Sequence, residues 1–196
     1  MVPTNGRWST RVAPLLLAGL AWAGPTATAS AITVQFPSDD STVVASVGFI
    51  DADEIGYFWK VSRGDSVTEG FTGTGLSSVT GLDLEFDVTQ NVLASGAFTH
   101  WDVLLNGISV GDWMWTALDG IGHLSLSYLF PAIVGDGDYT IRMAVLNEVA
   151  PGAGSIALGF PGEATLTGTA APEPGTLGLI GAGLLGIAFG APRRRA

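Results

Sequence analysis

The sequence predicts an all-β protein built as an antiparallel β-sandwich, and three observations carry this prediction. Between residues 32 and 168, short runs rich in Val, Ile, Thr, Phe, Tyr and Trp alternate with turn-forming residues. Many of these runs alternate apolar and polar residues with a period of two, which gives a strand one dry and one wet face. No long helical period interrupts them. Strands with a single wet face are what two packed antiparallel sheets require.

The alternation is clearest over residues 82–88, where the leucines, the phenylalanine and the valine point one way and the acids point the other. The same pattern places Tyr139, Ile141, Met143 and Val145 on one face. The expected strands are 32–36, 42–49, 55–62, 67–72, 82–88, 100–105, 108–115, 123–130, 139–146, 155–160 and 164–168. So many short strands are typical of a jelly-roll or an immunoglobulin-like sandwich, and the sequence does not choose between them.

Two turns connect the strands in the second half of the chain. Asn106-Gly107 separates two strand-like runs, and both residues tolerate the positive φ of a type I′ hairpin turn. Residues 135–138, Gly-Asp-Gly-Asp, form a second cluster of turn residues. We therefore expect β-hairpins or tight connections at both places.

The C-terminal segment has the features of a membrane span. Residues 175–191 carry no charge and no polar face, so a helix over them rises roughly 25 Å, near the lower limit for crossing a bilayer. The positive-inside bias keeps the three arginines that follow in the cytoplasm. The two prolines that precede the span favour an extended backbone, which holds it away from the domain. The sequence therefore predicts a transmembrane helix with the rest of the chain on the outer side.

This order of prolines, span and arginines resembles the PEP-CTERM sorting signal of exported bacterial proteins. The residues that carry the resemblance are Pro172, Glu173, Pro174, Arg193, Arg194 and Arg195. It implies that the exosortase, a membrane protease-transpeptidase, recognises Pro-Glu-Pro and cuts near it. It also implies a Gram-negative host that makes exopolysaccharide, with biofilm formation as the setting. A plain single-pass anchor explains the span and the arginines equally well, but it does not explain Pro-Glu-Pro.

The N-terminal segment indicates export as well. Arg7 and Arg11 form a basic region, residues 12–23 are apolar, and Ala-x-Ala sites follow at 27–29 and 29–31. This is the pattern of a secretory signal peptide. We therefore expect a signal peptide over 1–31, a β-sandwich domain over 32–171 and the sorting signal over 172–196. The two end segments form helices that flank the sandwich in the precursor.

The composition excludes several classes of function. The chain has 18 acids against 8 basic residues, a formal net charge of −10, and no cysteine. Of the basic residues, Lys60, Arg63 and Arg142 are those that lie in the predicted sandwich. Such a polyanion is a poor partner for nucleic acid or for an anionic membrane surface. The lack of cysteine excludes thiol catalysis and cysteine-based zinc sites.

Acidic turns are candidate calcium sites, because calcium prefers clustered carboxylate and carbonyl oxygens. Asp39 and Asp40 form one such turn. The residues that we assign as candidate ligands lie in two others and are Asp51, Asp53, Glu54, Asp136 and Asp138. None of these turns matches an EF-hand loop. A solvated acidic turn is the alternative at each place.

Two tryptophans and two histidines are further candidates for function. Trp113 and Trp115 share one strand face, so they stack on sugar rings if that face is wet and belong to the core if it is dry. The core is favoured, because Met114 makes the other face of the strand apolar too. His100 and His123 each begin a strand, and no Gly-x-Ser-x-Gly accompanies them in the body, so we interpret them as surface histidines.

Two functional hypotheses follow from these observations. The first is a non-enzymatic structural or adhesive module that passes through the inner membrane, is sorted by exosortase to the cell surface or matrix, and associates with exopolysaccharide. It needs no cofactor other than the hypothetical calcium. The alternative is an exported carbohydrate-active hydrolase, which predicts a deep cleft with paired carboxylates in unequal environments. The first hypothesis predicts a filled sandwich without such a cleft.

Overall fold

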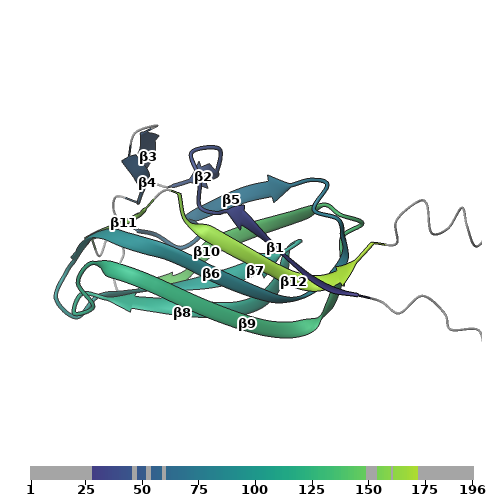
Figure 1. The fold of residues 1–196 in the computed structure, drawn as a ribbon. Coiled ribbons are helices and arrows are strands. Elements are labelled where there is room, and N and C mark those ends of the chain that lie inside the picture. Colours follow the sequence, from purple (N-terminus) through teal and green to yellow (C-terminus); the bar gives the residue numbers. More distant parts are fainter. Residues whose placement is uncertain are drawn as a thin grey trace, which may run out of the picture.

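The computed structural model describes residues 28–45, 48–51, 54–58, 61–148, 154–159 and 161–171. Their strands form two antiparallel sheets that pack face to face, so the predicted β-sandwich is confirmed (Figure 1). The helices predicted for the signal peptide and for residues 175–191 lie outside these ranges. Within the described ranges, no helix is long and apolar enough to cross a membrane.

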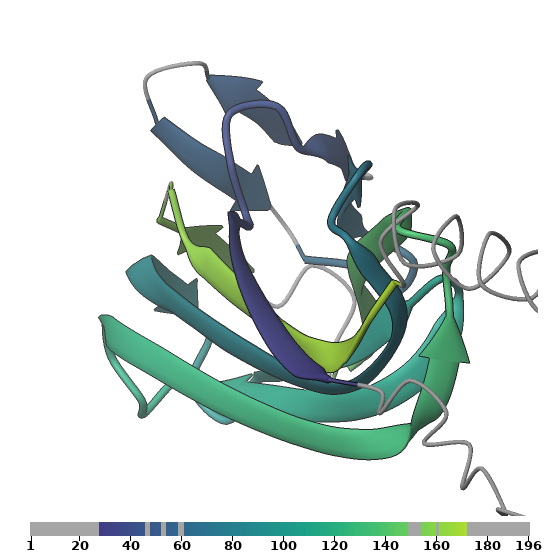
Figure 2. The ribbon, with the colours of Figure 1, turned by 45° about the vertical axis from the view of Figure 1, so that its right-hand side comes forward.

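Of the described strands, seven form sheet A. They are β1 (Ala29–Gln35), β3 (Gly48–Asp51), β4 (Glu54–Phe58), β6 (Leu76–Leu93), β9 (Gly122–Val134), β11 (Gly154–Leu158) and β12 (Glu163–Ala170). The order is β1-β12-β6-β11-β4-β3, and β9 pairs with β6 as well. Figure 2 shows β1, β12, β6 and β9 side by side in a curved layer. The first residue of β1 lies before residue 32, where the sequence places the start of the domain.

The other five described strands form sheet B, in the order β2-β5-β10-β7-β8. They are β2 (Thr42–Val44), β5 (Ser66–Phe71), β7 (Phe98–Leu105), β8 (Ile108–Thr116) and β10 (Tyr139–Glu148). The single strand predicted over 42–49 is wrong, because β2 belongs to sheet B and β3 to sheet A. The connecting residues Ala45, Ser46 and Val47 contain no glycine or proline, so the local pattern did not reveal the change of sheet.

The longest strand, β6, holds sheet A together. It has 18 residues and pairs with β12 and β11 on one side and with β9 on the other. The predicted strand 82–88 is its middle part, where the alternation is regular. The ends were missed because residues such as Gly81, Gln90 and Asn91 interrupt the alternation, although they still pair with neighbouring strands.

The core lies between the inner faces of the two sheets. Leu82, Leu84, Phe86 and Val88 of β6 are buried, as the alternation predicts. The predicted inner row of β10, from Tyr139 to Val145, is buried opposite them. Each such side chain contributes roughly 1.5–3 kcal/mol by leaving water.

Three aromatic rings connect the sheets across this core. Trp101 of β7 and Trp113 of β8 stack with ring centroids 5.2 Å apart. Phe86 of β6 meets Trp113 edge to face at 5.7 Å. The rings therefore join sheet B to the middle of sheet A, and aromatic pairs of this kind add about 0.5–1.5 kcal/mol beyond the area they bury.

Both predicted turns are present. Asn106 (φ 50°) and Gly107 (φ 77°) connect β7 to β8 with the positive angles of a type I′ turn. Asp136 (φ 46°) and Gly137 (φ 92°) connect β9 to β10 in the same region of backbone space. The Asp138 amide closes this second turn by donating to the Gly135 carbonyl at 2.6 Å.

Tyr128 joins the two sheets where β9 lies beside β8. Its hydroxyl donates to the Asp112 carbonyl at 3.1 Å, and its ring lies directly over Gly111. A Cβ at Gly111 would lie only 2.1 Å from Tyr128 Cδ1. Burial raises the pKa of Tyr128 to about 12, and the charge of Asp112 adds to the shift.

We expect Gly111→Ala to destabilise the protein by about 1–3 kcal/mol, because the added methyl group must displace the Tyr128 ring. Urea denaturation measures this loss. Gly70→Ala is the matched control, since the nearest atom to its Cβ is Thr140 Oγ1 at 4.0 Å. Equal stability of the two variants would show that the position of the Tyr128 ring does not require a glycine at residue 111.

We also expect the free energy of unfolding to fall as the pH rises from about 10 to about 12. In that range the unfolded chain loses the Tyr128 proton while the native state keeps it, because the native pKa is raised. Tyr128→Phe should make the fall shallower without abolishing it, since burial also raises the pKa of Tyr139. Denaturant midpoints across this pH range measure the slope, and an unchanged slope in the variant would contradict the assignment.

Candidate functional site

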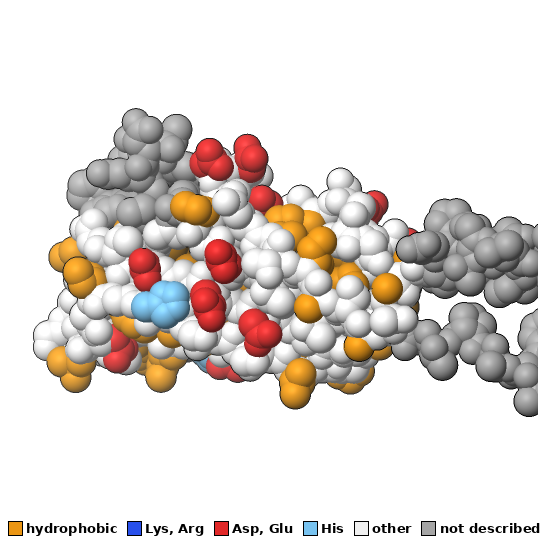
Figure 3. Space-filling view, viewed as in Figure 1, with side chains coloured by type: hydrophobic (Ala, Val, Ile, Leu, Met, Phe, Trp, Pro, Cys, Tyr) orange, Lys and Arg blue, Asp and Glu red, His pale blue; other side chains and the backbone are white. Residues whose placement is uncertain are grey.

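The outer face of sheet A carries a concentration of carboxylates. Because side chains alternate along a strand, the burial of Leu84 and Phe86 places Asp83, Glu85 and Asp87 of β6 on the exposed side. Figure 3 shows acidic side chains gathered around a histidine on the face turned toward the viewer, and no Lys or Arg is visible among its coloured residues.

The strand register continues these acids into polar rows across four strands. One row crosses β1, β12, β6 and β9 and consists of Gln35, Glu163, Glu85 and Ser125. The next row consists of Thr33, Thr165, Asp83 and Ser127. In this second row the hydroxyl oxygens of Thr33 and Thr165 are 2.9 Å apart and share a hydrogen bond. We call these two rows the polar face.

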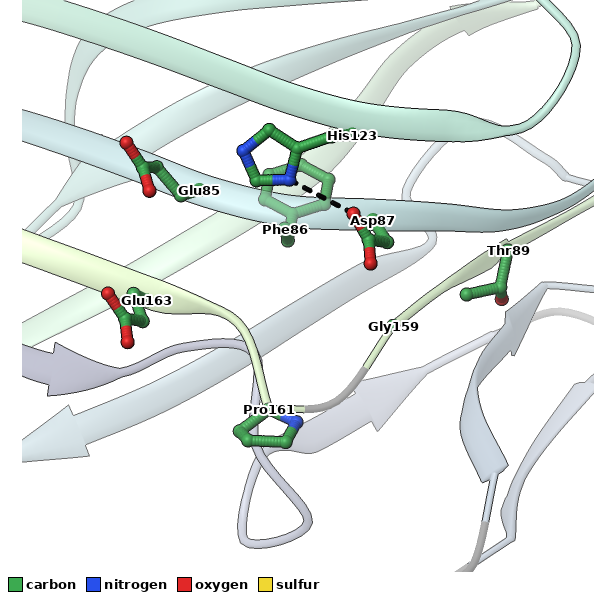
Figure 4. Close-up of a pocket in the computed structure, with 8 residues that line it drawn as sticks. All are labelled: Glu85, Phe86, Asp87, Thr89, His123, Gly159, Pro161 and Glu163. Carbon is green, nitrogen blue, oxygen red and sulfur yellow. Dashed lines mark hydrogen bonds and ion pairs between the residues drawn. The ribbon is translucent and has the colours of Figure 1, made fainter.

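A groove of 380 Å³ lies at one end of the polar face. The side chains that line it include Glu85, Asp87, Thr89, His123, Pro161 and Glu163 (Figure 4). Gly159 and Pro161, which lie in the connection between β11 and β12, also line the groove, and the Gly159 amide donates to the Asp87 carbonyl of β6 at 2.6 Å. At the other end of the connection, the Gly162 amide donates to the Pro37 carbonyl at 2.7 Å.

His123 and Asp87, which both line the groove, are joined by a hydrogen bond. His123 Nδ1 lies 3.0 Å from Asp87 Oδ1, and the two side chains are 59% and 61% exposed. Figure 4 shows the imidazole reaching from β9 over β6 toward this carboxylate. An exposed pair of this kind contributes little to stability, so it leaves a histidine and a carboxylate available to a ligand.

Glu85 and Glu163 lie directly opposite each other on β6 and β12. Figure 4 shows the two carboxylates side by side, and both residues are exposed. Like charges in this position destabilise a sheet. A ligand that donates hydrogen bonds or carries positive charge would relieve the repulsion.

The side chains of the polar face are suited to forming hydrogen bonds with a ligand. The carboxylates of the polar face accept hydrogen bonds, its Ser and Thr hydroxyls donate and accept them, and His123 in the adjoining groove can do either. Phe86, which also lines the groove, is almost fully buried and offers no ring face to a ligand. The arrangement therefore suits a ligand with many hydroxyl groups rather than a flat apolar one.

The structure places the two candidate tryptophans in the core. Trp113 is 4% exposed and Trp115 is 9% exposed. The Trp115 indole nitrogen donates to the Gly120 carbonyl at 3.2 Å. Both side chains point between the sheets, so neither ring presents a face on which a sugar could stack.

None of the candidate calcium ligands is among the described residues that line the groove. One oxygen of Asp138 accepts a hydrogen bond from the Gly73 amide at 3.1 Å. This carboxylate therefore connects the turn over residues 135–138 to the loop between β5 and β6. Asp51 and Glu54 pair at the end of the β3–β4 hairpin, and Asp53 lies outside the described residues. The part of the chain that the structure describes holds no group of three or more His, Cys, Asp or Glu arranged around a metal. Calcium binding stays a prediction.

Sequence analysis did not find the groove. The acids of β6 are visible as an alternating pattern, but Glu163 and His123 become their neighbours only through long-range pairing. His100, the other histidine, lies 2.7 Å from Asp112 on the outer face of sheet B. Both histidines are thus paired with carboxylates on the outer faces of the sheets, as the surface interpretation expects.

Comparison with known families identifies the C-terminal segment. The profile of the PEP-CTERM protein-sorting motif matches residues 170–195. The chain carries a PEP-CTERM sorting motif. The resemblance stated from the prolines, the span and the arginines is therefore confirmed, and the motif implies export and processing by exosortase. Its residues from Pro172 to Arg195 lie outside the described part of the chain.

The sandwich is similar to solved carbohydrate-binding modules at low identity. The CBM36-1 domain of a multidomain xylanase from the hindgut metagenome of Trinervitermes trinervoides aligns over 72% of this chain and 100% of its own, with 14% identity and a TM-score of 0.47. A family 35 module from Clostridium thermocellum aligns over 68% and 97%, with 12% identity and a TM-score of 0.41. These likenesses are too distant to say what this chain binds. No curated protein matches the chain.

We expect Glu85→Gln to stabilise the domain by roughly 0.2–1 kcal/mol, because it removes the repulsion from Glu163. The gain should shrink in 1 M salt, where charges are screened within about 3 Å. Asp83→Asn is the matched control, since Asp83 faces Thr165 and Ser127. If thermal denaturation finds the same stability for the two variants, the repulsion between Glu85 and Glu163 does not destabilise the domain.

Proposed function

We propose that this protein is a non-enzymatic module of the cell surface or extracellular matrix, and that its polar face binds a neutral polysaccharide. The observation that carries the proposal is that one chain has both a sorting motif for export and an exposed sheet face of carboxylates and hydroxyls. The sorting motif supports delivery, and the face supports binding.

The geometry of the polar face supports a polysaccharide ligand. Its two rows cross four strands, and neighbouring strands are about 4.8 Å apart, so the face extends over a length comparable with several sugar units. Each carboxylate can accept hydrogen bonds from two hydroxyls of a sugar ring. Such bonds to a charged acceptor contribute about 1.5–3 kcal/mol each.

The charge of the protein supports a neutral ligand over an acidic one. The chain has a formal net charge of −10, and the charged side chains of the polar face are the three carboxylates of Asp83, Glu85 and Glu163. A polysaccharide with many uronate or sulfate groups would be repelled unless cations bridged the two. Hydroxyl groups meet no such barrier.

The proposed route begins with export and transit through the inner membrane. Exosortase would cut near Pro-Glu-Pro and deliver the domain to the surface or matrix, among exopolysaccharide in a biofilm. The motif match supports this route, since its prolines, span and arginines are the parts that a membrane-embedded processing enzyme would encounter.

A hydrolase is the second candidate, and the Glu85–Glu163 pair is the observation that favours it. Glycosidases use two carboxylates on either side of the bond that they cut, and one of the two is kept protonated by its environment. Glu85 and Glu163 instead lie together on one open face, and both are exposed. We therefore favour binding over hydrolysis.

Replacing both glutamates with glutamine should weaken the retention of the domain by neutral polysaccharide roughly tenfold or more, because charged acceptors become neutral amides. Affinity electrophoresis or calorimetry measures this change. The same variant should fold at least as stably as the parent, so lost binding would not reflect unfolding.

Asp102→Asn is the control for a lost charge elsewhere, since Asp102 accepts a hydrogen bond from Ser109 on sheet B. Equal weakening by this control would contradict the assignment of the face. Release of reducing ends by the parent protein would favour the hydrolase.

A further inference from the structure

The sorting motif begins inside the folded sheet. Its match starts at Ala170, which is the last residue of β12. The Ala170 amide donates to the Thr28 carbonyl at 3.1 Å, and the Ala171 amide donates to the Gly75 carbonyl at 2.8 Å. Pro172 follows directly, so no spacer separates the sandwich from Pro-Glu-Pro. Figure 1 shows the end of β12 beside the start of β1, at one end of the sandwich.

A processing enzyme must bring the bond that it cuts into its active site, and a backbone that is already hydrogen-bonded in a sheet cannot pair with a second protein as well. The residues just before the motif are not free. Thr169 is paired with Ala29 of β1 on one side and with Ser78 of β6 on the other. Its carbonyl also accepts a hydrogen bond from Ser77 Oγ at 3.2 Å. While these bonds hold, the backbone before Pro172 cannot enter an active site.

The C-terminal end of β12 has features that let its backbone hydrogen bonds open more easily than those of the rest of the strand. The pairing with β6 changes register between Thr167 and Gly168 and again between Thr169 and Ala170, which interrupts the ladder twice. Thr169 and Ala170 are half-buried, whereas Ala164 and Leu166 nearer the middle are fully buried. β1, the neighbour on the open side, is an edge strand. Few buried contacts and broken ladders are the features of segments that open locally.

We propose that residues 169–171 detach from β1, from β6 and from the residues just before these two strands before exosortase can cut, so that the end of the sheet gates sorting. This inference rests on the proposed processing and adds its rate-limiting step. The folded domain then slows its own release from the membrane. Any change that loosens the last residues of β12 speeds the cut, and any change that tightens them delays it.

The direct test is a flexible spacer in the full chain, expressed in a host that contains an exosortase. Gly-Ser-Gly-Ser inserted between Ala171 and Pro172 gives the enzyme a free backbone without opening the sheet. A pulse-chase measurement of precursor and product should show a several-fold faster cut. The control places the same insert between Pro174 and Gly175, which lengthens the tether to the membrane equally but leaves the residues before the motif paired, and it should give no acceleration.

The outcomes separate the gate from the processing itself. Slower or unchanged cutting with the first insert, or equal acceleration by both inserts, would overturn the gate. A parent chain that is never cut would overturn the proposed processing and the gate with it. A parent that is cut, without any response to the first insert, would overturn the gate alone.

A milder pair of variants tests the same step without lengthening the chain. Ser77→Ala removes the hydroxyl that binds the Thr169 carbonyl, so cutting should become roughly two- to tenfold faster. Ser77→Thr keeps a hydroxyl in a strand and should cut at the rate of the parent. Hydrogen exchange should also be faster at the Ala170 and Ala171 amides than at those of Leu82 and Leu84, and equal protection would contradict the gate.

Discussion

The two-residue period of β6 is the constraint on which the rest of the structure depends. A strand must send alternate side chains to opposite faces, so the row that builds the core also fixes the row that meets solvent. Leu82, Leu84 and Phe86 bury one face, and Asp83, Glu85 and Asp87 therefore stand on the other. Because β6 pairs with β12, β11 and β9, this division of faces extends across the middle of sheet A.

The same division of faces explains why the aromatic residues stabilise the packing of the sheets, whereas the polar side chains lie at the surface. Trp101 and Trp113 stack inside and meet Phe86 from the opposite sheet, so they hold the layers together. Hydrogen-bonding side chains then remain for the outer face. The cost is the exposed repulsion between Glu85 and Glu163, which the domain tolerates at a surface where a ligand with many hydroxyls could relieve it.

Local patterns in the sequence predict the inner rows, both positive-φ turns and the sorting motif, because each depends on residues that are close in the chain. The groove could not be predicted in this way. Glu163 reaches Glu85, and His123 reaches Asp87, through strand pairings between distant segments. The predictions for the ends of β6 and for residues 42–49 failed for a related reason. Pairing partners, rather than local alternation, determine where these strands end and to which sheet they belong. The burial of Trp113 and Trp115 depends on which face of β8 meets sheet A, and the sequence only favoured that outcome.

The central claim is that the polar face of sheet A is the surface that binds a glycan. The most direct measurement is the titration of the isotope-labelled domain with a neutral oligosaccharide, followed by the backbone amide shifts in an NMR spectrum. The account predicts that shifts concentrate at residues 83–87, 123–127 and 163–165, on three adjacent strands. Shifts concentrated on the outer face of sheet B, or none at saturating concentrations of the glycan, would contradict it.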